Sequence, residues 1–151
     1  MFWDCFALTT LDLGDKFNTS NVTNMMGMFA QCKALSTLDL GDKFDTTKVS
    51  DMNNMFSGCS VLSTLDLGDK FDTTKVTNMA NMFNHCGTLT SLDVSNFNTQ
   101  NVTIMGGMFS NCSSLESLDI SNFNTQSVTN MMNMFSNCSS LESLDISNFN
   151  T

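Results

Sequence analysis

The sequence predicts a solenoid of the α/β class, in which each repeat adds one strand to a parallel sheet and one short helical or 3₁₀ turn. Three observations predict it: a fixed period, apolar pairs spaced by two residues, and apolar groups spaced by three and four. The period is marked by Met-Phe pairs that recur at steps of 27, 27, 27, 26 and 26 residues. Such a period is typical of units that bury their apolar faces by stacking on one another. The pairs begin at Met1, Met28, Met55, Met82, Met108 and Met134.

The strand of each repeat is predicted at the triplet Leu-Asp-Leu or its variants. Two aliphatic residues separated by one Asp place both apolar side chains on one face of a strand and the Asp on the other. Stacked repeats then align these triplets as a parallel sheet. The first aliphatic residues are Leu11, Leu38, Leu65, Leu92, Leu118 and Leu144.

The helical turn is predicted just before each Met-Phe pair. Val128, Met131, Met134 and Phe135 follow one another at intervals of three, three and one, which suits one or two turns of α- or 3₁₀-helix. A bend must precede this segment, and Phe-Asn-Thr supplies side chains that bond to nearby backbone groups. We therefore expect the Thr column to cap local backbone amides. Its members are Thr19, Thr46, Thr73, Thr99, Thr125 and Thr151.

The same alignment predicts the domain organisation. Residues 1–151 read as a single solenoid of five complete repeats and a partial sixth. Because the chain opens at a Met-Phe pair and stops inside a repeat, we expect it to be a piece of a longer array.

Charge and composition exclude some classes of partner. The formal net charge is −9, and all six lysines precede residue 76. Binding to nucleic acid needs a clustered basic face, so a nucleic-acid partner is not expected, and an anionic membrane surface is disfavoured for the same reason. No stretch approaches the roughly 18 consecutive apolar residues of a membrane span, so direct membrane insertion is not expected either.

One cysteine per repeat forms a column without any Cys-x-x-Cys pair, so the sequence offers no zinc site. Stacked cysteines about 5 Å apart could form disulfides, but small buried thiols that fill the core are the favoured interpretation. Two Met columns have the spacing of core positions, and no metal ligand is assigned. The cysteines are Cys5, Cys32, Cys59, Cys86, Cys112 and Cys138.

The Asp column is the candidate ligand-binding feature. Stacking brings carboxylates to about 4.8 Å, where repulsion in water costs on the order of 1 kcal/mol per pair. Hydrogen bonds from flanking hydroxyls, raised carboxylate pKa values or bound cations such as calcium would offset that cost. A solvated ladder without a ligand is the alternative. The candidate residues are Asp12, Asp39, Asp66, Asp93, Asp119 and Asp145, with Thr37, Thr64, Ser91 and Ser117 beside them.

Trp3 and Phe6 interrupt the repeat pattern at the amino-terminal edge, where other units carry small or polar residues. They are candidates for covering the first unit, for packing on an upstream domain, or for joining chains head to tail. Exposed unit edges favour open-ended association of the last kind.

The motifs Leu-x-x-Leu-Asp-Leu, Phe-Asn-Thr, Val-Thr-Asn-Met and Met-Phe, together with the Cys column, resemble a bacterial surface-protein repeat of about 26 residues. This repeat occurs in lipoproteins and adhesins of the Listeria, Mycoplasma and lactobacillus type and is similar to BspA-like leucine-rich repeats. The resemblance implies a right-handed, leucine-rich-repeat-like solenoid at the bacterial cell surface or in the extracellular space.

No nucleophile elbow, phosphate-binding glycine loop or His-Glu-x-x-His motif is present, so we expect no enzymatic activity and no cofactor beyond the calcium alternative. The sequence and the resemblance together predict a binding or adhesion module that presents the Asp ladder to a protein or glycan. A structural spacer or a self-assembling scaffold is the alternative.

Overall fold

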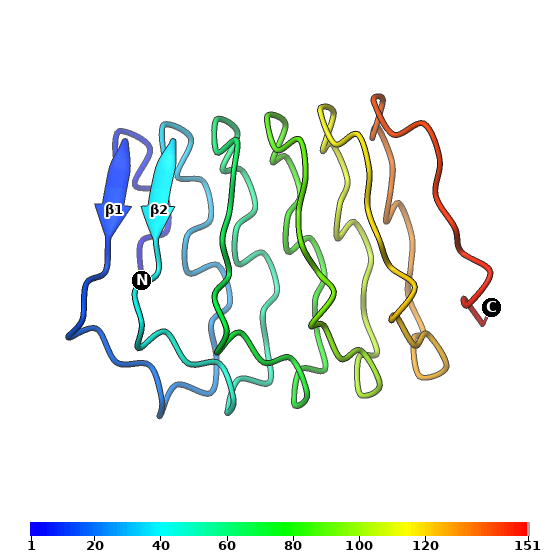
Figure 1. Cartoon of the computed structure of the whole chain (residues 1–151), viewed down its shortest axis with the longest axis horizontal. Coiled ribbons are helices and arrows are strands. Elements are labelled where there is room, and N and C mark those ends of the chain that lie inside the picture. The colour runs from blue at the N-terminus through cyan, green and yellow to red at the C-terminus, as the bar shows by residue number, and fades with distance from the viewer. Residues whose placement is uncertain (151) are drawn as a thin grey trace.

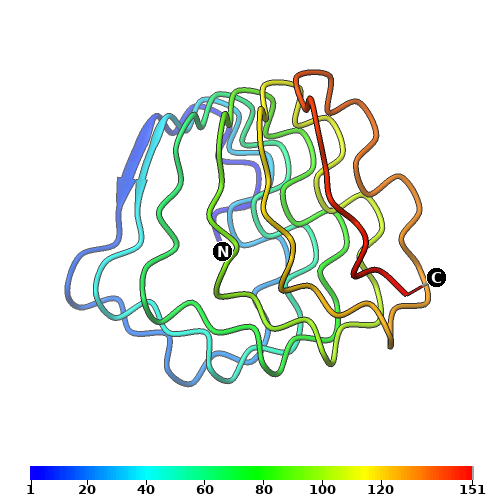
Figure 2. The same ribbon diagram turned by 45° about the vertical axis from the view of Figure 1, so that its right-hand side comes forward.

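The computed structural model describes residues 1–150, and these residues form a stack of coils. In Figure 1 the chain descends on the near side of each coil, returns behind it and advances from the blue end to the red end, so the solenoid is right-handed. Figure 2 shows the same coils arranged one behind another. We number the units from each Met-Phe pair. Units 1 to 6 are residues 1–27, 28–54, 55–81, 82–107, 108–133 and 134–150.

The strand side of the solenoid contains two short strands, β1 (Thr10–Asp12) and β2 (Thr37–Asp39). They pair in parallel, with Leu11 opposite Leu38. The triplets of later units occupy the same column, but none of them is a strand in the described part of the chain. No backbone hydrogen bond between residues 1 and 150 joins the triplet of unit 2 to that of unit 3. The predicted sheet is therefore formed by the first two units only.

The continuous backbone ladder lies instead on the opposite, turn side. Parallel bridges connect Asn24 to Asp51, Asp51 to Asn78, Asn78 to Ile104, and Ile104 to Asn130. Further hydrogen bonds of the same kind run between the Met-Phe segments of neighbouring units; the Phe29 N–H, for example, donates to the Met55 carbonyl at 2.9 Å. The turn side thus holds the units together through their backbones, as a parallel sheet would.

The segment expected to be helical is a series of β-turns, and residues 1–150 contain no helix. The N–H groups of Met28, Ala30 and Cys32 each donate to the carbonyl three residues earlier, at 3.1, 3.1 and 3.3 Å. Gly27 and Gln31 have a φ of 60°, which interrupts any helix and directs neighbouring N–H groups to the next unit. The helical part of the prediction is not confirmed, because successive turns produce the same apolar spacing of three. It follows that no helix of the described chain could cross a membrane.

Both left-handed positions recur along the stack. One precedes each Met-Phe pair and the other precedes each Cys. Gly or Asn occupies the first position in each of units 1 to 5 and the second position in three of six units, and these residues adopt positive φ at least cost. They are Gly27, Asn54, Asn81, Gly107 and Asn133 at the first position, and Asp4, Gln31, Gly58, His85, Asn111 and Asn137 at the second.

The core is a column of apolar side chains between the strand side and the turn side. Phe29, Phe56, Phe83 and Phe109 are fully buried, and consecutive rings in their column stack with centroids 5.3 to 5.7 Å apart. In a second column, consecutive centroids from Phe44 to Phe123 are 6.5, 5.7 and 6.4 Å apart. The spacing is more uniform in the first column, whose backbone belongs to the turn-side ladder.

The cysteines are free thiols, and four of the six are fully buried. The thiol of Cys59 donates to the Phe29 carbonyl of the preceding unit at 3.3 Å, and Cys86 does the same to Phe56. Burial raises the pKa of Cys59 and Cys112 from 9.0 to about 12. The prediction that the cysteines fill the core as small side chains is confirmed for these four.

The Thr column bridges units instead of capping local amides. The buried Thr73 hydroxyl donates to the Asn98 carbonyl at 3.0 Å and accepts the Asn98 N–H at 2.7 Å. Thr19, Thr46, Thr99 and Thr125 make the same two contacts with the following unit. The expectation of local capping is therefore wrong, because these hydroxyls point along the solenoid axis into the next coil.

Candidate ligand-binding face

The structure places all six aspartates of the ladder on the exposed strand side, and we call this surface the aspartate face. The aliphatic residues on either side of each Asp in units 1 to 5 point toward the core, as the alternation of a strand requires, whereas Ile146 of unit 6 is exposed. The hydroxyl residues named with the ladder are exposed on the same surface. The face comprises Asp12, Asp39, Asp66, Asp93, Asp119 and Asp145 with Thr37, Thr64, Ser91 and Ser117.

Each carboxylate is fixed by a backbone amide of its own unit. The Oδ1 atom of Asp66 accepts the Gly68 N–H at 2.9 Å, and that of Asp93 accepts the Ser95 N–H at 2.9 Å. The other four aspartates accept the N–H two residues later in the same way. These Asx turns end the extended triplets and fix the direction of every side chain.

The pKa values of three aspartates, and the positions of the hydroxyls that bond to them, differ from the expectations. Bonds from the Ser95 hydroxyl and amide hold the pKa of Asp93 below its usual value. The pKa of Asp119 and Asp145 is lowered by Ser121 and Ser147 in the same way. Raised pKa values are therefore wrong for these three groups. The stabilising hydroxyls lie two residues after each Asp, not at the flanking positions before it.

The geometry gives no support to a calcium site. Within residues 1–150 no three carboxylate, imidazole or thiol groups converge as metal ligands. Calcium takes six to eight oxygen ligands at short distance, whereas these carboxylates follow one another along a line.

Shallow depressions mark the aspartate face between units 2 and 4. One of about 430 Å³ is lined by Thr37, Thr64, Ser91 and the carboxylates of Asp66 and Asp93, among others. A second, of about 760 Å³, separates β2 from the turn that follows Asp66. Within residues 1–150 no backbone hydrogen bond joins the triplets of these units. Sequence analysis missed the depressions, since it assumed a closed sheet.

The amino-terminal end carries a second candidate surface. Trp3 is 56% exposed and Phe6 is 66% exposed. The Trp3 ring packs against Gly27, where any Cβ would overlap it. A depression of about 310 Å³ near this end is lined by Met1, Phe17, Val22, Met25, Met26 and Met28 with three polar residues.

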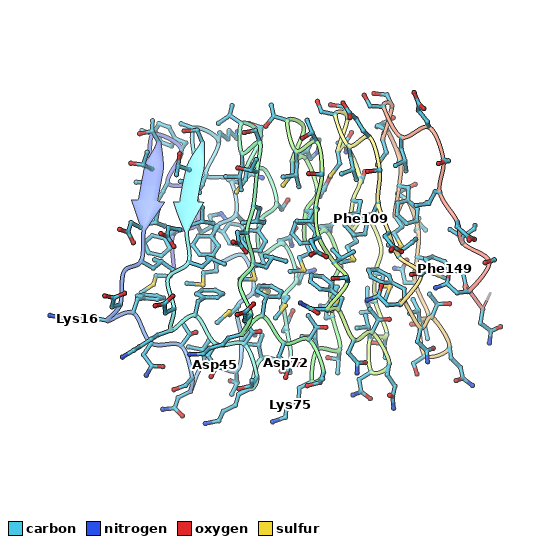
Figure 3. The ribbon with its side chains drawn as sticks, in the orientation of Figure 1. Lys16, Asp45, Asp72, Lys75, Phe109 and Phe149 are labelled. Atoms are coloured by element: carbon cyan, nitrogen blue, oxygen red, sulfur yellow. The ribbon has the colours of Figure 1, made fainter. Side chains whose placement is uncertain are left out.

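Four charged side chains outside the face lie along one edge of the solenoid. Figure 3 shows Lys16, Asp45, Asp72 and Lys75 along the lower edge, below β1 and β2. This edge is neutral in units 4 to 6, where Ser, Asn and Gln replace Asp and Lys.

The same change alters the contacts between neighbouring turns. In unit 5 the Asn122 side chain donates to the carbonyls of Val94, Ser95 and Phe97 at 3.0, 3.1 and 2.7 Å. Asn148 repeats this pattern on unit 5. Both bridging asparagines belong to a Ser-Asn-Phe segment, in units 5 and 6.

A comparison with known protein families gives a match along the whole repeat array. The family described as Mycoplasma protein of unknown function, DUF285, matches residues 1–92 and 62–151, which together span the chain. The chain belongs to the DUF285 family. This membership confirms the resemblance to BspA-like leucine-rich repeats. No curated protein gives a significant match to this DUF285 chain.

Two solved structures share the fold of this DUF285 chain. A leucine-rich repeat protein from Eubacterium ventriosum is 22% identical with a TM-score of 0.59, over 96% of this chain and 34% of that protein. The T. pallidum leucine-rich repeat protein is 17% identical with a TM-score of 0.51, over 93% of this chain and 68% of that protein. The chain thus spans about a third of the length of the Eubacterium protein. At these identities the likeness shows a leucine-rich-repeat solenoid and nothing about ligands.

Proposed function

We propose that the chain is a non-enzymatic binding module that presents the aspartate face to a protein or glycan partner. Extended solenoid surfaces are the usual binding surfaces of repeat proteins, and adhesion at a bacterial cell surface or in the extracellular space is the biological role we infer from the family resemblance.

The observation that supports this proposal most directly is the fixed geometry of the six carboxylates. Each is exposed, is held by an Asx turn and repeats once per unit. A partner that binds along the axis therefore meets pre-oriented acceptors and loses little entropy in ordering them. The negative charge favours a basic protein segment over a neutral glycan.

The test measures binding of a fluorescent peptide of alternating Lys and Gly by anisotropy, beside a peptide of alternating Gln and Gly. We expect the triple variant Asp39→Asn, Asp119→Asn, Asp145→Asn to bind the basic peptide about tenfold more weakly at moderate salt. Asn retains the Oδ1 acceptor, and Asn18 and Asn98 already make such turns, so the fold is preserved.

A matched control removes the same charge elsewhere. Asp15→Asn, Asp45→Asn, Asp72→Asn changes three carboxylates outside the aspartate face. Equal weakening in both triple variants would show that net charge alone attracts the peptide, and would refute the proposal.

The second candidate function is a self-assembling scaffold or spacer, which the exposed Trp3 and Phe6 favour. In such a scaffold the apolar amino-terminal end would stack on the last unit of another copy. Sedimentation velocity over a hundredfold concentration range tests it. Concentration-dependent growth that disappears in Trp3→Ser, Phe6→Ser would support assembly, whereas a monomer at all concentrations would exclude it.

A further inference from the structure

The turn-side ladder crosses every junction between units. The Phe29 N–H donates to the Met55 carbonyl at 2.9 Å between units 2 and 3, and the Phe56 N–H donates to the Met82 carbonyl at 2.9 Å between units 3 and 4. The other three junctions have the same bond. Because these bonds recur without interruption, the turn side fixes the distance between neighbouring units along that side of the solenoid.

The strand side has a backbone bond of its own that forms at two of the junctions. The Ser36 N–H donates to the Thr9 carbonyl at 2.9 Å between units 1 and 2. The Glu116 N–H donates to the Thr90 carbonyl at 3.1 Å between units 4 and 5. These four residues occupy one column of the repeat, two positions before the first Leu of each triplet, and Ser63 is its member in unit 3.

The same bond is not formed at the two junctions in between. In the described chain no hydrogen bond joins the Ser63 N–H to the Ser36 carbonyl, or the Thr90 N–H to the Ser63 carbonyl. The depressions of about 760 and 430 Å³ lie at these junctions. Ser63 and Thr90 are exposed, so water can occupy the unused donors and acceptors. The open segment is thus flanked on both sides by junctions that show the register in which it would close.

Closure needs no change in the rest of the fold. The chain contains no proline, so every member of the column has the N–H that the bond requires. The turns that follow the triplets of units 2 and 3 are already in contact, since the Lys70 Nζ atom donates to the Asp42 carbonyl at 2.9 Å. A small tilt of the units about the turn-side ladder therefore brings the strand-side backbones together.

The charge of the aspartate ladder opposes this closure. Asp39 is paired with Asp12 in β1 and β2. Across the junction between units 4 and 5, bonds from the following serine lower the pKa of Asp119, and repulsion from Asp93 acts in the opposite direction. Asp66 lies between these two pairs. Closing both junctions beside Asp66 would give Asp39, Asp66 and Asp93 a near carboxylate on each side.

The opposing contributions to closure are of similar size. Repulsion between neighbouring carboxylates in water is of the same order as the net gain from a backbone hydrogen bond that replaces bonds to water. Removing the charge can therefore decide between the open and the closed arrangement. A bound cation also favours the closed arrangement directly, because it interacts more strongly with carboxylates that lie closer together.

We propose that the strand side between units 2 and 4 closes into a continuous parallel sheet when a basic protein segment neutralises Asp39, Asp66 and Asp93. This inference rests on the proposed function, because the basic segment is the partner expected on the aspartate face. The free chain keeps the open arrangement. In the bound chain the pairing of β1 and β2 extends through units 3 and 4 to the bonded junction with unit 5.

The experiment detects the bonds themselves, as scalar couplings between the amide nitrogen and the carbonyl carbon across each hydrogen bond. In the ¹³C,¹⁵N-labelled free chain we expect couplings for Ser36 to Thr9 and for Glu116 to Thr90. Saturation with the alternating Lys and Gly peptide should add couplings for Ser63 to Ser36 and for Thr90 to Ser63, and should slow hydrogen exchange at the Ser63 and Thr90 amides about tenfold. The alternating Gln and Gly peptide should add none. The two new couplings in the free chain, or their absence from the peptide-bound chain, would overturn the proposal.

A triple variant tests closure without any ligand. The substitutions remove the charge of the central ladder and retain an Oδ1 acceptor for each Asx turn, as Asn98 already does. We expect the two new couplings to appear in the variant without peptide, and the coupling of Ser36 to Thr9 reports that the chain is folded. The variant is Asp39→Asn, Asp66→Asn, Asp93→Asn.

A matched variant removes three carboxylates outside the aspartate face. It lowers the net charge of the chain by the same amount and should leave the strand side open. New couplings in both variants, or in neither, would show that the ladder does not control closure and would overturn the proposal. The matched variant is Asp15→Asn, Asp45→Asn, Asp72→Asn.

Failure of this inference can be told apart from failure of the proposed function. Anisotropy reports whether the basic peptide binds, whereas the couplings report whether the strand side closes. Peptide binding without new couplings would refute closure and retain the aspartate face. No peptide binding, together with new couplings in the ladder variant, would refute the proposed function and support control of closure by charge.

Discussion

At the scale of single residues, two columns of polar side chains connect the units in opposite directions. Each bridging Thr contacts the backbone of the following unit, while each thiol from Cys32 onward donates to a Phe carbonyl of the preceding unit. Both columns are buried in the central units, and among the described residues no buried side-chain polar atom lacks a partner. Buried polar groups of this kind contribute stability only while their bonds are complete.

Thr73→Val tests the Thr column. Valine has nearly the same shape, so the change removes the hydroxyl and leaves the Asn98 N–H and carbonyl without their partner. We expect the free energy of unfolding to fall by about 1–3 kcal/mol, measured by urea denaturation. Thr73→Ser keeps the hydroxyl and should lose much less. The exposed neighbour Thr74→Val should have little effect, and an equal loss at Thr74 would contradict the bridging role.

Ionisation of the buried thiols should lower the free energy of unfolding as the pH rises above 9. Burial holds the pKa of Cys59 and Cys112 at about 12 in the folded chain, against the ordinary 9.0. Below pH 9 the thiols stay protonated in both the folded and the unfolded chain, so they add no pH dependence to the free energy of unfolding. Above pH 9 the unfolded chain ionises first, so stability falls until about pH 12. At pH 10 we expect a loss of about 1 kcal/mol per thiol relative to pH 8. The decline should be flatter in Cys59→Ala, Cys112→Ala, and an identical decline would contradict this assignment.

At the scale of the elements, the period predicted the stack, the buried columns and the exposed Asp, but not which side carries the backbone ladder. The spacing from Val128 to Met134 fits a helix and a run of β-turns equally well, because both return apolar residues after three positions. The distinguishing signal was Gly or Asn immediately before each Met-Phe pair, as at Gly27 and Asn54. The restriction of the strand-side sheet to the first two units could not be predicted. It depends on the distance between units, which the turn-side ladder sets.

Gly107→Ala tests the left-handed position before the Met-Phe pair. Gly107 has a φ of 65°, and a Cβ there would overlap the Asn81 carboxamide. We expect a loss of roughly 1–2 kcal/mol in the free energy of unfolding, from the backbone conformation alone. Gly87→Ala is the control, because Gly87 is outside the left-handed region and a Cβ there meets only ordinary contacts. A loss at Gly87 as large as that at Gly107 would argue against the left-handed requirement.

At the scale of the whole molecule, the aspartate face could be located from the sequence, whereas the depressions between units 2 and 4 could not. The Asp column follows from alternation within each triplet. The depressions lie where no backbone hydrogen bond of the described chain joins the triplets of neighbouring units. Contacts between units of this kind appear only when two coils are placed against each other.

Removing one complete unit tests whether the solenoid behaves as a one-dimensional stack. Deleting residues 55–81 joins Asn54 to Met82, which reproduces the natural Asn81-Met82 junction and keeps every column in register. Because each unit contacts only its neighbours, we expect the shortened chain to fold with an unchanged circular dichroism spectrum per residue. Its denaturant m-value should fall by roughly a fifth, in line with the surface removed. Deleting residues 55–68 takes out half a unit, misaligns the Phe, Cys and Thr columns, and should abolish cooperative unfolding. Equal folding of both shortened chains would show that register between units is not what holds the solenoid together.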